Sequence, residues 1–223
     1  MKDKQNVNYF MKSGWMKPTG LGLLIAGIAF LFFGWGFISY ILMVVFIPAG
    51  IVLFIVGAST RSTDAEMDEF IAKKYENFEV RLDLDKDYSK RLLKHVHPEN
   101  FESYVYDEGL LYAKSNTGYL RTSEYQKTIL HMLSDAIYVS VRRISLVEDK
   151  VDDKIYEIPY AELSAVSALR EERSFDFNKK SFSAKVCEVR IEYGGGLVLI
   201  IPTKDNANID AVVEKINKMR ESA

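Results

Sequence analysis

The hydrophobic residues of this chain are concentrated in one run, from Thr19 to Thr60, which contains no Asp, Glu, Lys or Arg. As a single α-helix its 42 residues would be about 63 Å long, roughly twice the 30 Å hydrocarbon core of a bilayer. Gly34 and Gly36 lie near the midpoint and permit a tight reversal. The pattern therefore predicts a transmembrane α-hairpin over residues 18–60, although a buried hairpin in a soluble protein is the alternative.

Aromatic and charged residues around the run indicate its orientation. Trp15 and Trp35 bracket the first span, as interfacial aromatic rings do. The N-terminal tail, residues 1–17, is basic, Arg61 closes the second span and the connecting turn carries no charge. Because segments rich in Lys and Arg stay in the cytoplasm, we expect a multi-pass protein of the cell membrane with both termini cytoplasmic. A single cysteine, Cys187, agrees with a reducing compartment.

Glycines recur at seven-residue spacing inside the run. Seven residues are nearly two helical turns, so each set lines one side of its helix and lets another backbone approach closely. The alternative is that glycine is simply common in membrane helices. We expect transmembrane packing, with a homo-oligomer as one form of it, through Gly20, Gly27, Gly34, Gly50 and Gly57.

A helical linker, residues 61–100, follows the run. Thr63 and Glu66 form a capping-box pattern, after which apolar residues recur at helical spacing, so a helix is predicted over residues 64–77. A second, short helix is predicted over residues 89–96, where a following proline would stop it.

From Phe101 the pattern changes to short apolar runs of β type separated by turn residues. Alternation is clearest in VCEVRIEY, residues 186–193, where charged and apolar side chains point to opposite faces. Three glycines at 194–196 supply the positive φ of a hairpin turn, whereas a phosphate-binding loop would continue into Gly-Lys-Ser or Gly-Lys-Thr and a helix. The predicted strands are 102–106, 110–114, 119–122, 127–133, 136–144, 154–158, 165–169, 185–193 and 197–201.

An amphipathic helix is predicted from Asn208 to near the end of the chain, with Ile209, Val212 and Ile216 on one face. A series of antiparallel strands closed by one helix is typical of a small barrel or a two-sheet sandwich. The sequence therefore predicts an α+β membrane protein in which residues 101–223 form a small β-barrel or sandwich with a C-terminal capping helix.

The segments YEIPYAELSAV (156–166), EVRIEY (188–193), GGGLVLIIP (194–202) and NIDAVVEKINK (208–218) resemble the bacterial pleckstrin-homology-like and related GRAM-like domains. The resemblance covers roughly residues 125–220, and it implies that the first segment marks the middle strands and that the last helix caps a barrel. The N-terminal hairpin is similar to the membrane anchors found on many such bacterial proteins.

Residues 161–173 have two conflicting interpretations. Their composition has high helix propensity, with Leu163, Val166 and Leu169 at helical spacing. The resemblance instead implies a strand over this segment. We predict a strand.

Candidate catalytic chemistry is sparse. His95, His97 and Glu99 have metal-ligating side chains, but there is no second His/Cys cluster to complete a tetrahedral site, and two solvated imidazoles are the alternative. The sequence has no nucleophile elbow, kinase signature or dinucleotide fingerprint, so we expect no catalytic residue, metal or cofactor. His131 is interpreted as a partly buried strand residue, and Cys187 as a small core residue rather than a nucleophile.

Charge limits the partners of the C-terminal part. Residues 62–223 hold 24 Lys and Arg against 30 Asp and Glu, which disfavours nucleic acid and broad adhesion to anionic lipid. A local basic feature is the loop KSNTGYLR, which begins at Lys114 and ends at Arg121. In lipid-binding pleckstrin homology domains a loop of this kind carries a Lys and two further basic residues that hold phosphates. Lys114 and Arg121 match that pattern and are the candidate ligand-binding residues, whereas Ser123 stands where a further basic residue is expected.

Together these observations predict a membrane-anchored cytoplasmic binding or scaffolding module that engages a protein, a peptide or a lipid headgroup at the membrane surface. The alternative function is a membrane-tethered metal-dependent enzyme that uses His95, His97 and Glu99. Anchoring would raise the effective concentration of the domain toward partners in the same membrane.

Overall fold

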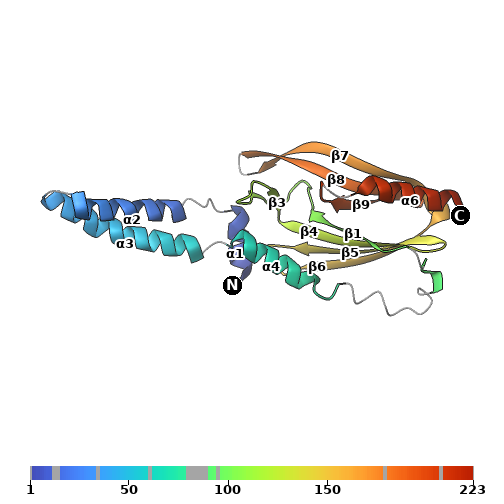
Figure 1. The fold of residues 1–223 in the computed structure, drawn as a ribbon, viewed down its shortest axis with the longest axis horizontal. Helices are drawn as coiled ribbons and strands as arrows, with labels where there is room; N and C mark the ends of the chain where they lie inside the picture. Colours follow the sequence, from blue (N-terminus) through green and yellow to red (C-terminus); the bar gives the residue numbers. More distant parts are fainter. Residues whose placement is uncertain are drawn as a thin grey trace. The chain divides into compact units, whose positions relative to one another are not determined.

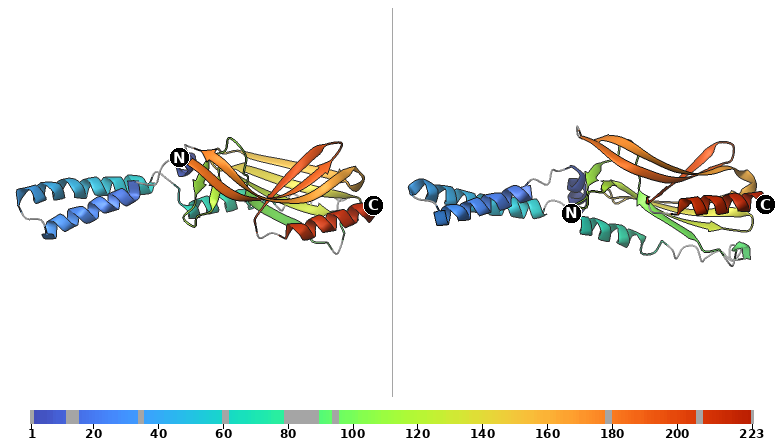
Figure 2. Two further views of the ribbon diagram at one scale, coloured as in Figure 1. Left: turned by 90° about the horizontal axis from the view of Figure 1, so that it is seen from above. Right: turned by 45° about the horizontal axis from the view of Figure 1, so that its top comes forward.

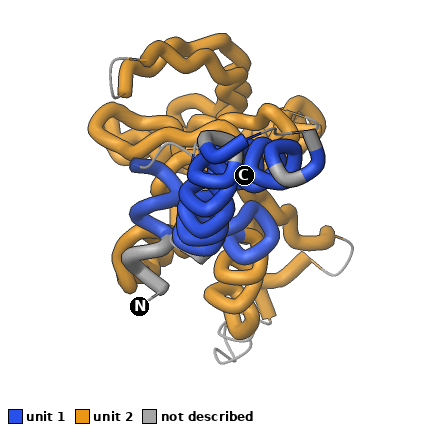
Figure 3. The backbone as a smooth tube through the Cα atoms, turned by 90° about the vertical axis from the view of Figure 1, so that its left-hand side faces the viewer, with its two compact units in different colours: residues 1–67 blue, residues 68–223 orange. Residues whose placement is uncertain are grey.

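The computed structural model describes residues 2–11, 16–33, 36–59, 62–78, 90–93, 96–177, 180–205 and 208–222. Over these residues the protein is α+β: helices fill the N-terminal region, antiparallel sheets follow and a helix ends the chain. The chain divides into two compact units, Met1–Met67 and Asp68–Ala223, which are coloured separately in Figure 3.

The first unit contains a hairpin of two helices, α2 (Met16–Phe33) and α3 (Phe37–Ser59), which lie side by side in Figures 1 and 2. Gly36 has a φ of 99°, which glycine adopts without a steric penalty. Gly34, which the sequence analysis placed in the same turn, lies outside the described residues, as do both tryptophans. The chain therefore reverses direction between α2 and α3, and one run of apolar residues forms two helices.

Glycines bring α2 and α3 into close contact. A β-carbon at Gly20 would lie 2.5 Å from the backbone nitrogen of Phe54 and 2.9 Å from the carbonyl oxygen of Gly50. A β-carbon at Gly27 would lie 2.7 Å from Ile47 Cγ1, and one at Gly50 would lie 2.9 Å from the Gly20 carbonyl oxygen. A β-carbon at Gly57 would lie 2.7 Å from the Lys17 backbone nitrogen. Residue numbers rise along α2 as they fall along α3, so the helices are antiparallel, and four of the five glycines singled out in the sequence pack inside this chain.

The outward surface of the hairpin is apolar. By length and composition α3 is the one helix of the described residues that is long and apolar enough to cross a membrane, and only 6% of its apolar segment Tyr40–Gly57 is buried. The apolar stretch of α2, Met16–Phe30, is shorter. Exposed side chains on the two helices include Leu21, Ile25, Ile28, Phe32, Phe37, Ile41, Val44, Val45, Ile51, Val52, Ile55 and Val56.

A helix that the sequence pattern did not reveal, α1 (Lys2–Met11), lies within residues 1–17, where we expected a basic tail. Ser62 Oγ donates a hydrogen bond to Asn6 Oδ1 over 2.7 Å, and Tyr9 OH donates to the Asp64 carboxylate. These contacts hold α1 against the residues that follow α3.

The capping box starts α4 (Asp64–Tyr75). The Thr63 N–H donates to Glu66 Oε2 over 2.7 Å, and the Glu66 N–H donates to Thr63 Oγ1 over 3.3 Å. The helix predicted over residues 64–77 is thus confirmed to within two residues of its end. Of the second predicted helix, over residues 89–96, the described residues Lys90 and Arg91 are helical, whereas Leu92 forms a β-bridge with Leu133.

The second unit contains three antiparallel sheets, ordered β1-β4-β5-β6, β2-β3 and β7-β8-β9. Each strand predicted from the sequence overlaps one observed strand. The strands are β1 (Glu99–Tyr104), β2 (Tyr112–Lys114), β3 (Leu120–Thr122), β4 (Glu124–Met132), β5 (Ala136–Ser145), β6 (Val151–Pro159), β7 (Leu163–Phe177), β8 (Lys180–Tyr193) and β9 (Leu197–Thr203). Hydrogen bonds between the described strands do not close a barrel, so the barrel form of the predicted fold is not found there.

The conflict over residues 161–173 is settled in favour of a strand. After a short 3-10 turn, η2 (Tyr160–Glu162), the chain enters β7, which pairs with β8 from Leu163 to Phe177. A register shift between Leu163 and Ala165 lies at its start. Pairing along β8 outweighs the local helix propensity, because tertiary context routinely overrides propensity.

One core joins the two larger sheets and the last helix, α6 (Ile209–Ser222). In Figures 1 and 2 the β7-β8-β9 sheet lies over the β1-β4-β5-β6 sheet, and α6 lies beside β9. Apolar residues of each part meet there, among them Leu130, Val139, Ile158, Val189, Ile201, Ile209 and Ile216. The apolar face predicted for residues 186–193 and the helical spacing that predicted α6 supply several of these positions, among them Val189, Ile209 and Ile216.

Candidate functional site

The candidate ligand-binding residues Lys114 and Arg121 both lie in the β2-β3 hairpin. In its register Lys114 pairs with Leu120 and Ala113 pairs with Arg121. Paired residues share a face and successive residues alternate, so Lys114 and Arg121 belong to opposite faces of the hairpin. The structure therefore brings the two residues into one element but does not converge their charges on one point.

Arg121 is already engaged within the second unit. Its Nη1 and Nη2 atoms donate to the two carboxylate oxygens of Asp68 in α4, over 2.9 and 3.1 Å. The guanidinium also lies 5.8 Å from the centre of the Tyr104 ring, and its side chain is only 11% exposed. Ser123, at the position without the expected basic residue, accepts the Leu111 N–H over 3.1 Å. Both residues hold the hairpin in place.

A second polar cluster fixes the end of α4 on the four-stranded sheet. The Tyr75 hydroxyl lies within hydrogen-bonding distance of two backbone carbonyl oxygens, those of Tyr125 (3.1 Å) and Arg142 (3.0 Å). Burial raises the pKa of Tyr75 far above its usual range. The hydroxyl therefore stays protonated and can donate at any physiological pH.

Arg142 is the centre of this cluster. Its Nε and Nη2 atoms each donate to Asp153 over 2.7 Å, and Nη1 donates to the Lys74 carbonyl oxygen over 3.0 Å. The guanidinium lies 4.9 Å from the centre of the Phe78 ring. Hydrogen bonding to Asp153 raises the pKa of Arg142, although burial opposes the shift. One side chain thus joins β5, β6 and the last turn of α4, where a cation is favourable.

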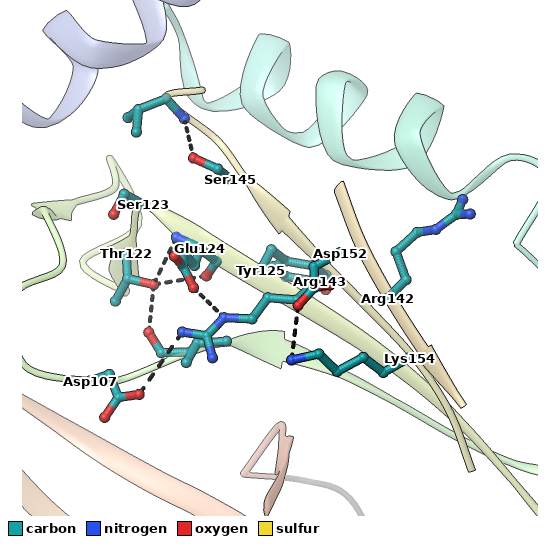
Figure 4. A network of polar contacts seen from close by, with 12 residues as sticks. Asp107, Thr122, Ser123, Glu124, Tyr125, Arg142, Arg143, Ser145, Asp152 and Lys154 are labelled. Atoms are coloured by element: carbon teal, nitrogen blue, oxygen red, sulfur yellow. Dashed lines mark hydrogen bonds and ion pairs between the residues drawn. The ribbon is translucent and has the colours of Figure 1, made fainter. Parts of the chain in front are cut away.

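Arg143 follows directly and takes the opposite face of β5, as Figure 4 shows. It donates to the Glu124 carboxylate, and its Nη2 lies 3.9 Å from Asp107 Oδ2. On the neighbouring strand the Lys154 Nζ atom lies 3.1 Å from Asp152 Oδ2. These pairs are partly exposed, and each basic group is matched by an acidic one.

Aromatic rings join the β2-β3 hairpin to the tip of β7-β8. The Tyr112 ring stacks on Phe175, with centroids 5.1 Å apart, and on Phe182, with centroids 6.3 Å apart. Tyr106 stacks on Phe175 from 5.9 Å. Tyr112 is 3% exposed, and burial raises the pKa of Tyr106 and of Tyr112 to about 12. Both hydroxyls are therefore neutral donors, to the carbonyl oxygens of Leu120 and Asp107 respectively.

The residues of the alternative metal site are only partly described. His95 lies outside the described residues, and His97 is exposed. Glu99 is the first residue of β1 and forms an ion pair with Lys215, whose Nζ lies 3.2 Å from Glu99 Oε1. Among the described residues no group of three or more His, Cys, Asp and Glu side chains is placed to hold a metal ion.

Two further residues noted in the sequence, His131 and Cys187, lie in strands of the β-rich unit. His131 is half-buried in β4, and burial lowers the pKa of its imidazole. Cys187 is 4% exposed in β8 and its thiol lies 3.6 Å from Asp205 Oδ1. Burial, and to a smaller extent the nearby Asp205 charge, raises the pKa of this thiol. Both side chains thus favour their neutral forms.

Comparisons with models of protein families, with curated proteins and with solved structures found no match.

Two side chains that bridge several elements of this unit were not predicted from the sequence to do so. Arg142 and Tyr75 were not singled out, although a sequence signal for Arg142 exists. In YVSVRRIS, residues 138–145, two arginines interrupt an apolar strand, and alternation sends one of them to each face. A charged residue in such a strand needs a specific partner, which here is Asp153 in β6.

Proposed function

We propose that the protein is a membrane-anchored binding or scaffolding module, in which α2 and α3 cross the cell membrane and both termini lie in the cytoplasm. The observation that carries this proposal is the apolar outward surface of the hairpin, where large aliphatic and aromatic side chains are exposed along both helices. Soluble proteins rarely expose contiguous apolar patches larger than a few hundred Å², whereas lipid tails accommodate them.

Helix dimensions support the same proposal. α2 has 18 residues and α3 has 23, so they are about 27 and 35 Å long, close to the roughly 30 Å of a bilayer core. At one end of the hairpin the Lys17 Nζ lies 5.8 Å from the centre of the Phe54 ring, which suits a long basic side chain at the membrane surface. Because the two helices are antiparallel, the start of α2 and the end of α3 lie on the same side of the membrane.

The β-rich unit is the part that we propose to bind the partner. Its two larger sheets and C-terminal helix share one core, in the order of strands followed by helix that the pleckstrin-homology-like resemblance implies. Arg121 is bonded to Asp68, and Lys114 belongs to the other face of its hairpin. A shared phosphate site is therefore less well supported than a protein or peptide partner.

Extraction from membranes tests the anchor. The full chain should stay in the membrane pellet after washing with alkaline carbonate, because the hairpin would be solvated by lipid on all sides. A chain that lacks residues 1–61 is the control and should appear in the supernatant. Release of the full chain by carbonate would contradict the proposal.

A further inference from the structure

The β7-β8 hairpin continues well beyond the rest of its sheet. β9 pairs with β8 only from Cys187 to Tyr193, whereas β7 and β8 remain paired as far as Phe177 and Lys180. Residues 171–177 and 180–186 therefore form a two-stranded extension, which we call the β7-β8 arm. Figure 1 shows this arm reaching past β9 towards β3.

A two-stranded ribbon is only marginally stable in water, so the arm depends on what it contacts. Most of its side chains are exposed or half-buried. Its aromatic residues contact the segment around the β2-β3 hairpin: Phe175 and its cross-strand partner Phe182 both stack on the Tyr112 ring, and Phe175 also stacks on Tyr106. Aromatic pairs of this kind contribute beyond their buried area. The arm thus packs on residues in and beside the β2-β3 hairpin.

The β2-β3 hairpin is in turn held by α4. Arg121 forms a bidentate ion pair with Asp68 in α4. The preceding residue, Leu120, accepts a hydrogen bond at its carbonyl oxygen from Tyr106 OH over 2.8 Å, and Tyr106 stacks on the arm. Two successive residues of β3 therefore connect α4 to the arm, one through its side chain and one through its backbone.

From these contacts we propose that docking of α4 on the β2-β3 hairpin and closure of the β7-β8 arm are coupled. When the Arg121–Asp68 pair forms, β3 is held where Tyr106 and Tyr112 can stack on the arm. When α4 leaves, the arm loses that support and opens more often. Coupling of this kind is reciprocal, so an open arm also weakens the docking of α4. This inference concerns residues 68–223 and does not depend on the hairpin lying in a membrane.

Hydrogen exchange of the full chain in detergent micelles tests the coupling. Asp68→Asn removes the charge that Arg121 binds but leaves an exposed side chain of the same shape. Because exposed ion pairs are weak, amides of residues 171–186 should exchange about two- to fivefold faster in this variant. Glu69→Gln, the same change of charge at the next position of α4, is the control and should leave the arm unchanged.

The reverse direction is tested from the arm. Phe175→Leu should speed the exchange of amides 68–75 in α4, whereas amides 124–145 in β4 and β5 should keep their rates. The inference is overturned if Asp68→Asn accelerates exchange only in α4, or if Glu69→Gln has the same effect on the arm. Equal acceleration in β4 and β5 would show general destabilisation and would also overturn it.

Discussion

Arg142 and Arg143 are neighbours in β5, and their side chains enter different surroundings. Arg142 is 8% exposed and is bonded to Asp153, to the Lys74 carbonyl oxygen and to the face of Phe78. The Arg143 side chain is 37% exposed. Its acidic partners, Asp107 and Glu124, are also partly exposed to solvent. The alternation of a strand thus gives two identical residue types different energetic roles.

Arg142→Met should lower the free energy of unfolding by about 2 kcal/mol, because it leaves the Lys74 carbonyl oxygen and Asp153 without their donor. Arg143→Met should cost about 1 kcal/mol or less, as exposed ion pairs do. Urea unfolding followed by the β-sheet circular dichroism signal measures both. Equal losses for the two variants would contradict this assignment.

Residue roles were harder to predict than residue positions. The sequence indicates that Lys114 and Arg121 flank a loop, but the register that separates their faces arises only when β2 and β3 pair. The acid that neutralises Arg121, Asp68, lies 53 positions away, so no local pattern links them. The partner of Arg142 is closer along the chain, across the β5-β6 turn, and alternation alone suggests which face it occupies.

At the scale of elements, the glycines of the hairpin set the separation of α2 and α3. Gly20 lies against the α3 backbone, whereas no described atom lies within 4 Å of a β-carbon built at Gly22. These two residues of one helix therefore give a matched pair of test positions.

Gly20→Leu should weaken the hairpin by about 1–3 kcal/mol, because the added side chain meets the backbone of Phe54 and the helices must separate. Gly22→Leu places the same side chain in open space and should have little effect. Thermal unfolding of the helical circular dichroism signal in detergent micelles compares the two. A similar loss in both variants would contradict the assignment, because the loss would then not depend on the contact that Gly20 makes with α3.

Most elements follow from the sequence because their signals are local. Short apolar runs of β type located most strands, the capping box located the start of α4, and three glycines with positive φ located the β8-β9 turn, whereas the strand over residues 161–173 was implied by the family resemblance. No local signal predicts the far half of β7, because Arg170, Glu171, Glu172 and Arg173 have helix propensity and no apolar alternation, and only the family resemblance implied a strand as far as Arg173. Its strand form depends on pairing with β8, which composition does not encode. α1 was missed for the same reason, since its contacts are with Ser62 and Asp64.

At the scale of the whole molecule, the net negative charge of residues 62–223 argues against lipid binding by the β-rich unit, whereas the uncharged hairpin suits a membrane anchor. The 30 acidic residues of the segment 62–223 outnumber its 24 basic ones, and Arg121 is already bonded within the chain. We propose that the hairpin supplies the membrane affinity and that the β-rich unit remains available to a protein or peptide.

Residues 62–223 alone should therefore fail to float with vesicles of anionic lipid, even at low salt, where electrostatic attraction is greatest. Density-gradient flotation across a salt series measures this, with neutral vesicles as the control. Flotation that is strong at low salt and lost at high salt would identify a headgroup as the ligand and would count against a protein partner.

Cys187 leaves the native protein without an exposed thiol. It is the one cysteine of the sequence, it is buried in β8, and the raised pKa keeps its sulfur as the poorly nucleophilic thiol. Maleimides and mild oxidants should accordingly spare the native protein. A cysteine engineered at an exposed position would then be the preferred target for a spin label or a fluorophore, without removal of the natural one.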